Sequence, residues 1–209
     1  GSISNIFDNP SHDYTKHLLS AEPSGQALRP KRGAKRILQA RNIKVWFPIK
    51  EGLLKRTKDY LKAVDNISVE VREGQTVGVV GESGSGKTTL GLALLRLEKS
   101  EGSIEFNQQK ISEIRTNKLR QLRREIQIVF QDPFGSLSPR MSVSQIIEEG
   151  LNIHKIASSS NEKTDLIVKA MEEVGLDPDS RYRFPHEFSG GQRQRIAIAR
   201  AIVLKPKFI

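Results

Sequence analysis

The stretch 79–95, VVGESGSGKTTLGLALL, constrains the fold more than any other part of the sequence. It combines a short apolar run, a cluster of Gly and Ser, a Lys followed by Thr, and an apolar pattern with helical spacing. Its fixed positions Gly81, Gly86, Lys87 and Thr88 match the GxxxxGK[ST] phosphate-binding loop, in the strand-to-helix context that this loop requires. This pattern predicts an α/β domain with a phosphate site at the start of a helix.

The residue types in this loop suit an anion, whereas an ordinary Gly/Ser turn needs neither the spacing nor the flanking elements. Small residues let several backbone N–H groups approach the ligand closely, and a helix N-terminus favours negative charge. Lys87 adds a full positive charge, and the Thr88 hydroxyl can ligate Mg²⁺. The predicted nucleotide-binding residues of this loop are Gly81, Ser83, Gly84, Ser85, Gly86, Lys87, Thr88 and Thr89.

Composition narrows the class of protein. Hydrophobic residues make up 36% and charged residues 28% of the chain, which is typical of a globular domain. The sequence has no cysteine, so a disulfide framework and Cys-ligated metal sites are excluded, and no apolar run approaches the roughly 20 residues of a membrane span. The net charge of +10 allows nucleic acid, anionic lipid or phosphorylated ligands as partners. Part of this positive charge lies in residues 29–36. This segment is either a solvated basic linker or a segment that binds a membrane surface or nucleic acid.

Alternating strand and helix patterns predict an α/β fold with a mostly parallel core. The Val-rich run 75–81 has the composition of a buried parallel strand, and so does 126–132. A polar insertion is expected at 50–63, after a strand ended by Pro48. Helices are expected at 117–126 and from Asn161 to a stop at Gly175. Further strands are expected at 37–49, 64–74 and 103–111.

A second anion-binding helix start follows in FSGGQRQR, from Phe188. Gly190 and Gly191 expose backbone donors just before a helix, and Ser189 can act as its cap. One phosphate loop is enough for one nucleotide, so this site is interpreted as serving a nucleotide held elsewhere. The alternative is a capped helix after a Gly turn.

Together these motifs resemble the ATP-binding subunits of ABC transporters. Residues 188–192 are similar to the signature loop, with Phe188 where Leu is usual, and Gln131 matches the Q-loop glutamine. Segments 131–143 and 181–201 resemble the oligopeptide and dipeptide importer branch, including fused double ATPases of the microcin C type. The resemblance covers 37–209 and implies a P-loop ATPase domain with a parallel core sheet, an antiparallel β subdomain and a helical subdomain at about 132–190.

The resemblance also implies roles for single residues. Lys87 and the loop amides would hold the β- and γ-phosphates of ATP. Thr88 and Gln131 would ligate Mg²⁺, and Gln131 would sense the γ-phosphate, which makes Lys87 and Gln131 the expected catalytic groups. Ser189, Gly190 and Gln192 would meet the γ-phosphate of ATP bound to an opposite ATPase domain.

Two surfaces are also implied. An aromatic residue before the phosphate loop would stack on adenine, and Phe47 fits this role ahead of Trp46 and Tyr60, unless it is a packed strand residue. The stretch 132–143 resembles the surface that receives the coupling helix of a membrane subunit. Phe134 is the expected anchor there, with a plain surface turn as the alternative.

The ends of the sequence suggest a larger parent protein. Residues 1–23 resemble the C-terminal tail of another ATPase domain, with Asp13 where Pro is expected, and 24–36 resemble a basic linker; an unrelated N-terminal extension is the alternative. The chain ends where the Walker B strand, catalytic Glu and switch His would follow. We therefore expect weak nucleotide binding and little hydrolysis by these residues alone, with Val77, Val79 and Val80 exposed.

The expected function is that of the ATP-binding and hydrolysing subunit of a peptide-type ABC importer. Its expected partners are a second ATPase domain, transmembrane permease subunits and, indirectly, a substrate-binding protein, at the cytoplasmic face of the inner membrane. Nucleic acid is not expected as a partner. The net charge keeps open a soluble ABC-type ATPase acting on nucleic acid or ribosomes, and a non-catalytic nucleotide-gated scaffold is a third alternative.

Overall fold

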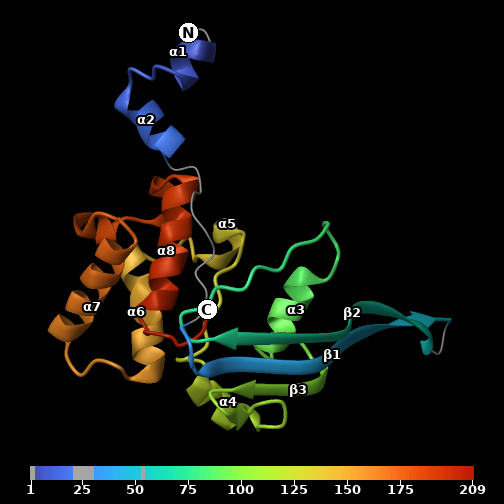
Figure 1. Ribbon diagram of the computed structural model, residues 1–209. Coiled ribbons are helices and arrows are strands. Elements are labelled where there is room, and N and C mark those ends of the chain that lie inside the picture. The colour runs from blue at the N-terminus through green and yellow to red at the C-terminus, as the bar shows by residue number, and fades with distance from the viewer. Residues whose placement is uncertain (1–2, 21–30, 53–54) are drawn as a thin grey trace.

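A four-stranded sheet with one helix against it and a separate group of helices form the body of the protein (Figure 1). The computed structural model describes residues 3–20, 31–52 and 55–209. Its strands are β1 (Arg36–Glu51), β2 (Arg56–Arg72), β3 (Glu101–Phe106) and β4 (Gln109–Lys110). Its helices are α1 (Ile3–Phe7), α2 (Asp13–Ser20), α3 (Lys87–Leu94), α4 (Thr116–Leu122), α5 (Pro133–Ser136), α6 (Val143–His154), α7 (Ser160–Glu173) and α8 (Gly190–Ile202), with 3₁₀ turns η1 (Pro178–Tyr182) and η2 (Pro185–Glu187).

The sheet has the order β2-β1-β3-β4, and every pair in it is antiparallel. Leu38 is opposite Val71 on β2 and Phe106 on β3, so an apolar row crosses three strands. A register shift between Ala40 and Ile43 keeps the later apolar residues of β1 on the buried side. β1 lies between β2 and β3, so the apolar residues of β1 have a neighbour on each side.

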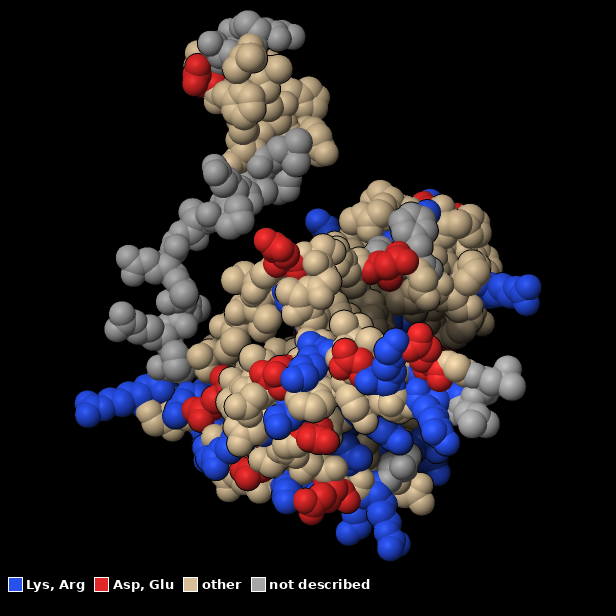
Figure 2. All heavy atoms as spheres, turned by 90° about the vertical axis from the view of Figure 1, so that its right-hand side faces the viewer, with Lys and Arg blue, Asp and Glu red and all other residues tan. Residues whose placement is uncertain are grey.

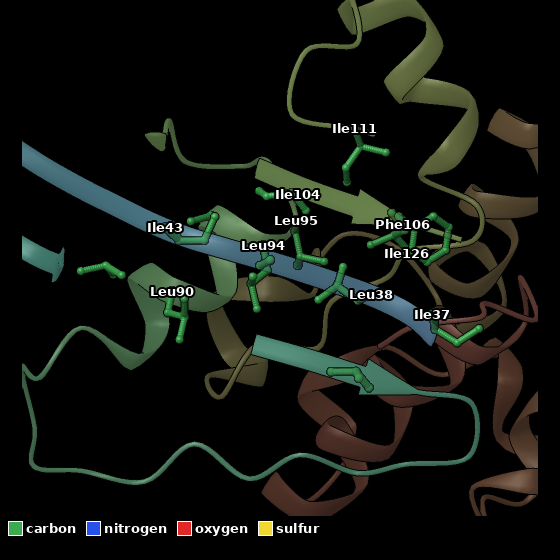
Figure 3. Packing of buried hydrophobic residues seen from close by; sticks show 14 of the residues in the cluster. Ile37, Leu38, Ile43, Leu90, Leu94, Leu95, Ile104, Phe106, Ile111 and Ile126 are labelled. Carbon is green, nitrogen blue, oxygen red and sulfur yellow. The ribbon is translucent and has the colours of Figure 1, made fainter. Parts of the chain in front are cut away.

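Each of the two parts of the body has its own hydrophobic cluster. The first joins the sheet to α3 and includes Leu38, Ile104 and Phe106, each of which is 1% exposed or less (Figure 3). Burying such a side chain contributes about 1.5–3 kcal/mol. The second cluster joins α6, α7 and α8, and its fully buried members are Val143, Ile147, Leu151, Met171, Ile196 and Ala199. Separate clusters are the physical basis for a β part and a helical part.

The helix predicted after Asn161 is confirmed as α7. Ile167, Ala170 and Met171 are buried along one face, as the spacing requires. Ser159 caps its N-terminus by accepting a hydrogen bond from the Glu162 N–H. Gly175 follows with φ +68°, a backbone conformation in which glycine has no steric penalty, and this ends the helix.

The predicted parallel core is not formed by the described residues. Residues 75–80 are in no strand, and Val77, Val79 and Val80 are 39%, 49% and 93% exposed, as expected for an unpaired segment. The run 127–130 is also not in a strand, and parallel pairing is limited to one bridge between Ile126 and Phe208. A strand requires a ladder of backbone partners, and among the described residues no neighbouring strand supplies one to 75–80.

The polar insertion predicted at 50–63 is mostly strand instead. β1 continues through Pro48 to Glu51, and β2 starts at Arg56, so the two form a long hairpin that projects from the body (Figure 1). Beyond Lys44, β1 pairs with β2 alone. Its other edge is open there, so the missing N–H of Pro48 breaks no ladder on that edge.

His154 gives one testable consequence of this packing. Burial at the end of α6 lowers the pKa of His154, and the charges of Arg124 and Arg120 lower it further. The folded protein therefore takes up this proton less readily than the unfolded chain, so stability is lost as pH falls below about 6.5. In urea unfolding between pH 7.5 and 5.5, His154→Gln should lose less stability than the parent protein. Equal losses would contradict this assignment.

Candidate phosphate-binding site

The loop predicted to bind phosphate connects the extended segment 75–80 to α3. Gly84 and Gly86 have φ of +80° and +88°, and Gly86 is the N-cap residue directly before α3. A Cβ on Gly86 would lie 2.0 Å from the carbonyl oxygen of Ala63 on β2. Glycine is therefore required at position 86, both by the backbone conformation and by the close approach of β2. The sequence motif includes Gly86 but does not reveal Ala63 as its neighbour.

The Lys87 ammonium lies over this loop. It donates to the carbonyl oxygen of Gly81 at 2.9 Å, to that of Glu82, and to the Ser85 hydroxyl at 3.3 Å. These neutral oxygens are weaker partners for an ammonium than a phosphate, whose hydrogen bonds are charge-assisted. The lysine is thus placed where an anion seated in the loop could exchange with its present partners.

Thr88 and Gln131 line one cavity of about 460 Å³ between α3 and the run 127–131. The structure therefore brings together the two residues predicted to ligate Mg²⁺. A hydroxyl and an amide oxygen are hard oxygen donors of the kind that Mg²⁺ prefers. No group of three or more acidic, His or Cys side chains that could hold a metal occurs in the described parts of the chain. A Mg²⁺ ion here fits best as one held largely by water and phosphate oxygens.

The second predicted site is the N-terminus of α8. The Ser189 hydroxyl accepts from the Gln192 N–H at 3.3 Å, and the Gln192 side-chain oxygen accepts from the Ser189 N–H at 3.0 Å. This capping box confirms the capped helix start. Gly190 and Gly191 are exposed, and a Cβ on either would meet nothing within 4 Å. The surface around the first turn is therefore open to a ligand or another protein surface.

Sequence reasoning missed how the segment before this helix is held. The Arg193 guanidinium donates from Nε to the carbonyl oxygen of Pro185 at 2.7 Å and from Nη2 to that of His186 at 3.2 Å. These bonds fix η2 against the first turn of α8. The QRQR run after the Gly pair was the available signal, but basic residues there are equally compatible with a solvated helix face.

Ser189→Ala should destabilise the protein by about 1 kcal/mol, because it removes the side-chain acceptor of the cap. Ser159→Ala is the matched control, since Ser159 caps α7 by the same kind of bond. Urea unfolding should show similar losses for both variants, whereas ATP-dependent association should be weakened only by Ser189→Ala. Association that both variants weaken equally would limit Ser189 to a structural role.

The geometry of the hairpin distinguishes the three aromatic residues considered for stacking on adenine. Trp46 and Tyr60 have ring centroids 6.1 Å apart, and the ammonium groups of Lys62 and Lys44 lie 4.5 and 5.4 Å from the Trp46 ring centroid. Phe47 follows Trp46 directly, and successive strand residues face opposite sides of a sheet. Its stacking on adenine stays a prediction. The side chain of Phe134, the expected coupling anchor, lies outside the described residues, although its backbone is part of α5.

The two sites are on the same side of the molecule but apart from each other. Figure 1 shows the loop before α3 and the start of α8 both at the upper side, with the loop over the sheet and α8 in the helical part. No cavity found among the described residues is lined by both. Within the described residues, the loop and the start of α8 are therefore two separate sites.

Comparison with known proteins agrees with these motifs. Residues 64–209 match the family model described as "ABC transporter". The chain is 56% identical, over all 209 residues, to the "Peptidoglycan transport ATP-binding protein YejF" of Agrobacterium fabrum. It is 43% identical, over its full length, to the "Glutathione import ATP-binding protein GsiA" of Salmonella typhimurium. The chain spans 38% of the length of each of these relatives.

Solved structures show the same fold. The dimeric MJ0796 cassette, described as a bacterial ABC transporter cassette, superimposes with a TM-score of 0.71 at 27% identity. The match covers 81% of this chain and 71% of that one. A second structure of that cassette is described as a post-hydrolysis state bound to ADP and Pi, and it matches equally well. In the described residues, no helix has the length and apolar character needed to cross a membrane.

Proposed function

The chain belongs to the ABC transporter family, and from this membership we propose that it is part of an ATP-binding and hydrolysing subunit that powers import of peptide-like substrates. The observation that carries the proposal is the loop before α3. Glycine is required at position 86 by the positive φ and by the close approach of β2. Within the described residues, the hydrogen bonds of the Lys87 ammonium go to neutral oxygens. Relatives named for peptidoglycan transport and for glutathione import support a peptide-like substrate class.

The loop residues act by binding and orientation. Backbone N–H groups from Ser83 to Thr89 hold the β- and γ-phosphates, and Lys87 balances their charge. Thr88 and Gln131 are the side chains that would hold Mg²⁺, which would neutralise negative charge on the β- and γ-phosphates. Gln131 lines the cavity beside α3 and lies two residues before α5, so it would link the phosphate site to the helical part.

The separation of the two sites favours a head-to-tail pair of ATPase domains. In such a pair, Ser189, Gly190, Gly191 and Gln192 of one domain meet the γ-phosphate of ATP held by the loop of the other. ADP lacks that third phosphate, so only ATP stabilises the closed arrangement. Closure is then a ligand-driven change between two states, since ATP binds the closed state better.

The same proposal includes the remaining partners. Residues 1–23 would be the tail of a preceding ATPase domain and 24–36 a linker, within a parent protein that carries both domains of the pair. Relatives more than twice as long as this chain support that organisation. Closure of the pair would move the permease subunits through their contacts with residues 132–143, at the cytoplasmic face of the inner membrane. A substrate-binding protein would act on the other side of the membrane.

Calorimetry with Mg-ATP, Mg-ADP and AMP tests this function. ATP and ADP should bind, and AMP should not, because it lacks both the β- and γ-phosphates that the loop holds. Sedimentation should show association with ATP and not with ADP. Equal affinity for AMP would exclude a phosphate-loop site. RNA or DNA binding that weakens steeply with salt would instead favour the nucleic-acid alternative.

A further inference from the structure

The projecting part of the β1–β2 hairpin carries an excess of positive charge. Residues 44–52 and 55–62, the basic arm, contain six basic side chains and two acidic ones. Lys50, Lys55 and Arg56 at its end are exposed and form no ion pair within the described residues. Figure 2 views the molecule from the side to which the arm points and shows Lys and Arg side chains projecting there, with acidic ones between them.

The arm also exposes apolar side chains that have no role in the fold. Ile49 is 48% and Leu61 is 60% exposed, although both are in strands. An exposed apolar surface on a projecting hairpin is typical of a contact surface, particularly where charged residues surround it. Beyond Val45, which belongs to the first hydrophobic cluster, the arm extends away from both clusters, so the fold itself does not need its length.

A surface of opposite charge lies at the other end of the molecule. Residues 172–179, the acidic edge, contain Glu172, Glu173, Asp177 and Asp179 and no basic residue. All four are exposed, and within the described residues Glu172 and Glu173 form no ion pair. The edge begins with the last two residues of α7 and lies on the same upper side of the molecule as the phosphate loop and the start of α8 (Figure 1).

We propose that, in the ATP-closed pair, the basic arm of one copy docks on the acidic edge of a second copy. The inference rests on the head-to-tail pair proposed above, formed here by two copies of this chain, each of which carries both an arm and an edge. A head-to-tail pair that places the α8 start of one copy over the phosphate loop of the other also brings the helical end of one copy toward the arm end of the other, because these are opposite ends of the body (Figure 1). Both contacts then form twice, and opposite charges meet at each.

Charge reversal in matched sets tests the docking, with ATP-dependent pairing of the full chain measured by sedimentation. Lys55→Glu with Arg56→Glu reverses the arm, and Glu172→Lys with Glu173→Lys reverses the edge. Each variant alone should pair about tenfold more weakly or worse, because like charges then face each other. An equimolar mixture of the two variants should restore pairing, since each arm then meets an edge of opposite charge.

Lys118→Glu with Arg120→Glu is the control, with the same charge change on α4 at the opposite side of the sheet (Figure 1). It should pair like the parent protein. All four reversed side chains of the arm and edge are exposed, and unfolding curves check that the variants fold. Lys55→Gln with Arg56→Gln adds a milder variant with a smaller expected loss.

The outcomes separate this inference from the function on which it rests. ATP-dependent pairing by the parent protein with no loss in the arm variant, or no recovery in the mixture, overturns the docking and leaves the pair intact. Absence of ATP-dependent pairing in the parent protein overturns the pair itself, and the docking with it.

Discussion

Lys87→Ala is expected to weaken Mg-ATP binding by roughly 30- to 1,000-fold. The ammonium of Lys87 lies on the loop, within hydrogen-bond distance of Gly81 and Ser85. A unit charge about 4 Å from a phosphate charge contributes up to about 4 kcal/mol near a protein surface, and a hydrogen bond to a charged group contributes about 2 kcal/mol, which sets the lower limit. Each 1.4 kcal/mol changes the dissociation constant tenfold. Calorimetric titration with Mg-ATP measures the effect directly.

Lys118→Ala provides the control for this experiment. It removes an equal charge from α4, where the side chain is exposed and lies outside the phosphate loop. Its affinity for Mg-ATP should equal that of the parent protein within about twofold, since distant exposed charges are screened by salt. An unchanged affinity in Lys87→Ala would show that the loop does not hold the terminal phosphates, and the proposed function would then lose its main support.

Local patterns were enough to predict the elements that carry their own start and stop signals. The helix after the phosphate loop, the Ser189 cap and the end of α7 at Gly175 each depend on a few neighbouring residues, and all three have the predicted form. The strand predicted at 103–111 is observed as the two strands β3 and β4, and the helix predicted at 117–126 is observed as α4, which ends at Leu122.

Features that depend on distant partners could not be predicted in the same way. The Val-rich run 75–80 has the composition of a buried strand, but burial requires a neighbour, and none among the described residues pairs with it. Pro48 indicated a strand end, whereas the open edge of β1 beyond Lys44 tolerates it. The likeness to the MJ0796 cassette confirms the fold class despite these local differences.

The stability of the phosphate loop depends on one such distant contact, and Gly86→Ala is expected to cost about 3 kcal/mol or more. The added Cβ would lie 2.0 Å from the Ala63 carbonyl oxygen, so either the loop or the backbone of β2 must move. The φ of +88° adds the cost of a left-handed conformation, about 1 kcal/mol for a non-glycine residue. Urea unfolding gives the loss in stability, and calorimetry should show that Mg-ATP binding is lost because the displaced loop no longer encloses the phosphates.

Gly84→Ala distinguishes the steric clash with β2 from the energetic cost of a positive φ. Gly84 has nearly the same φ, +80°, but a Cβ there would meet nothing within 4 Å. This variant should therefore lose only about 1 kcal/mol. The difference between the two variants, about 2 kcal/mol, measures how tightly β2 holds the start of α3. Equal losses would mean that β2 gives way without cost, and the loop would then be shaped by its own sequence alone rather than by the sheet beneath it.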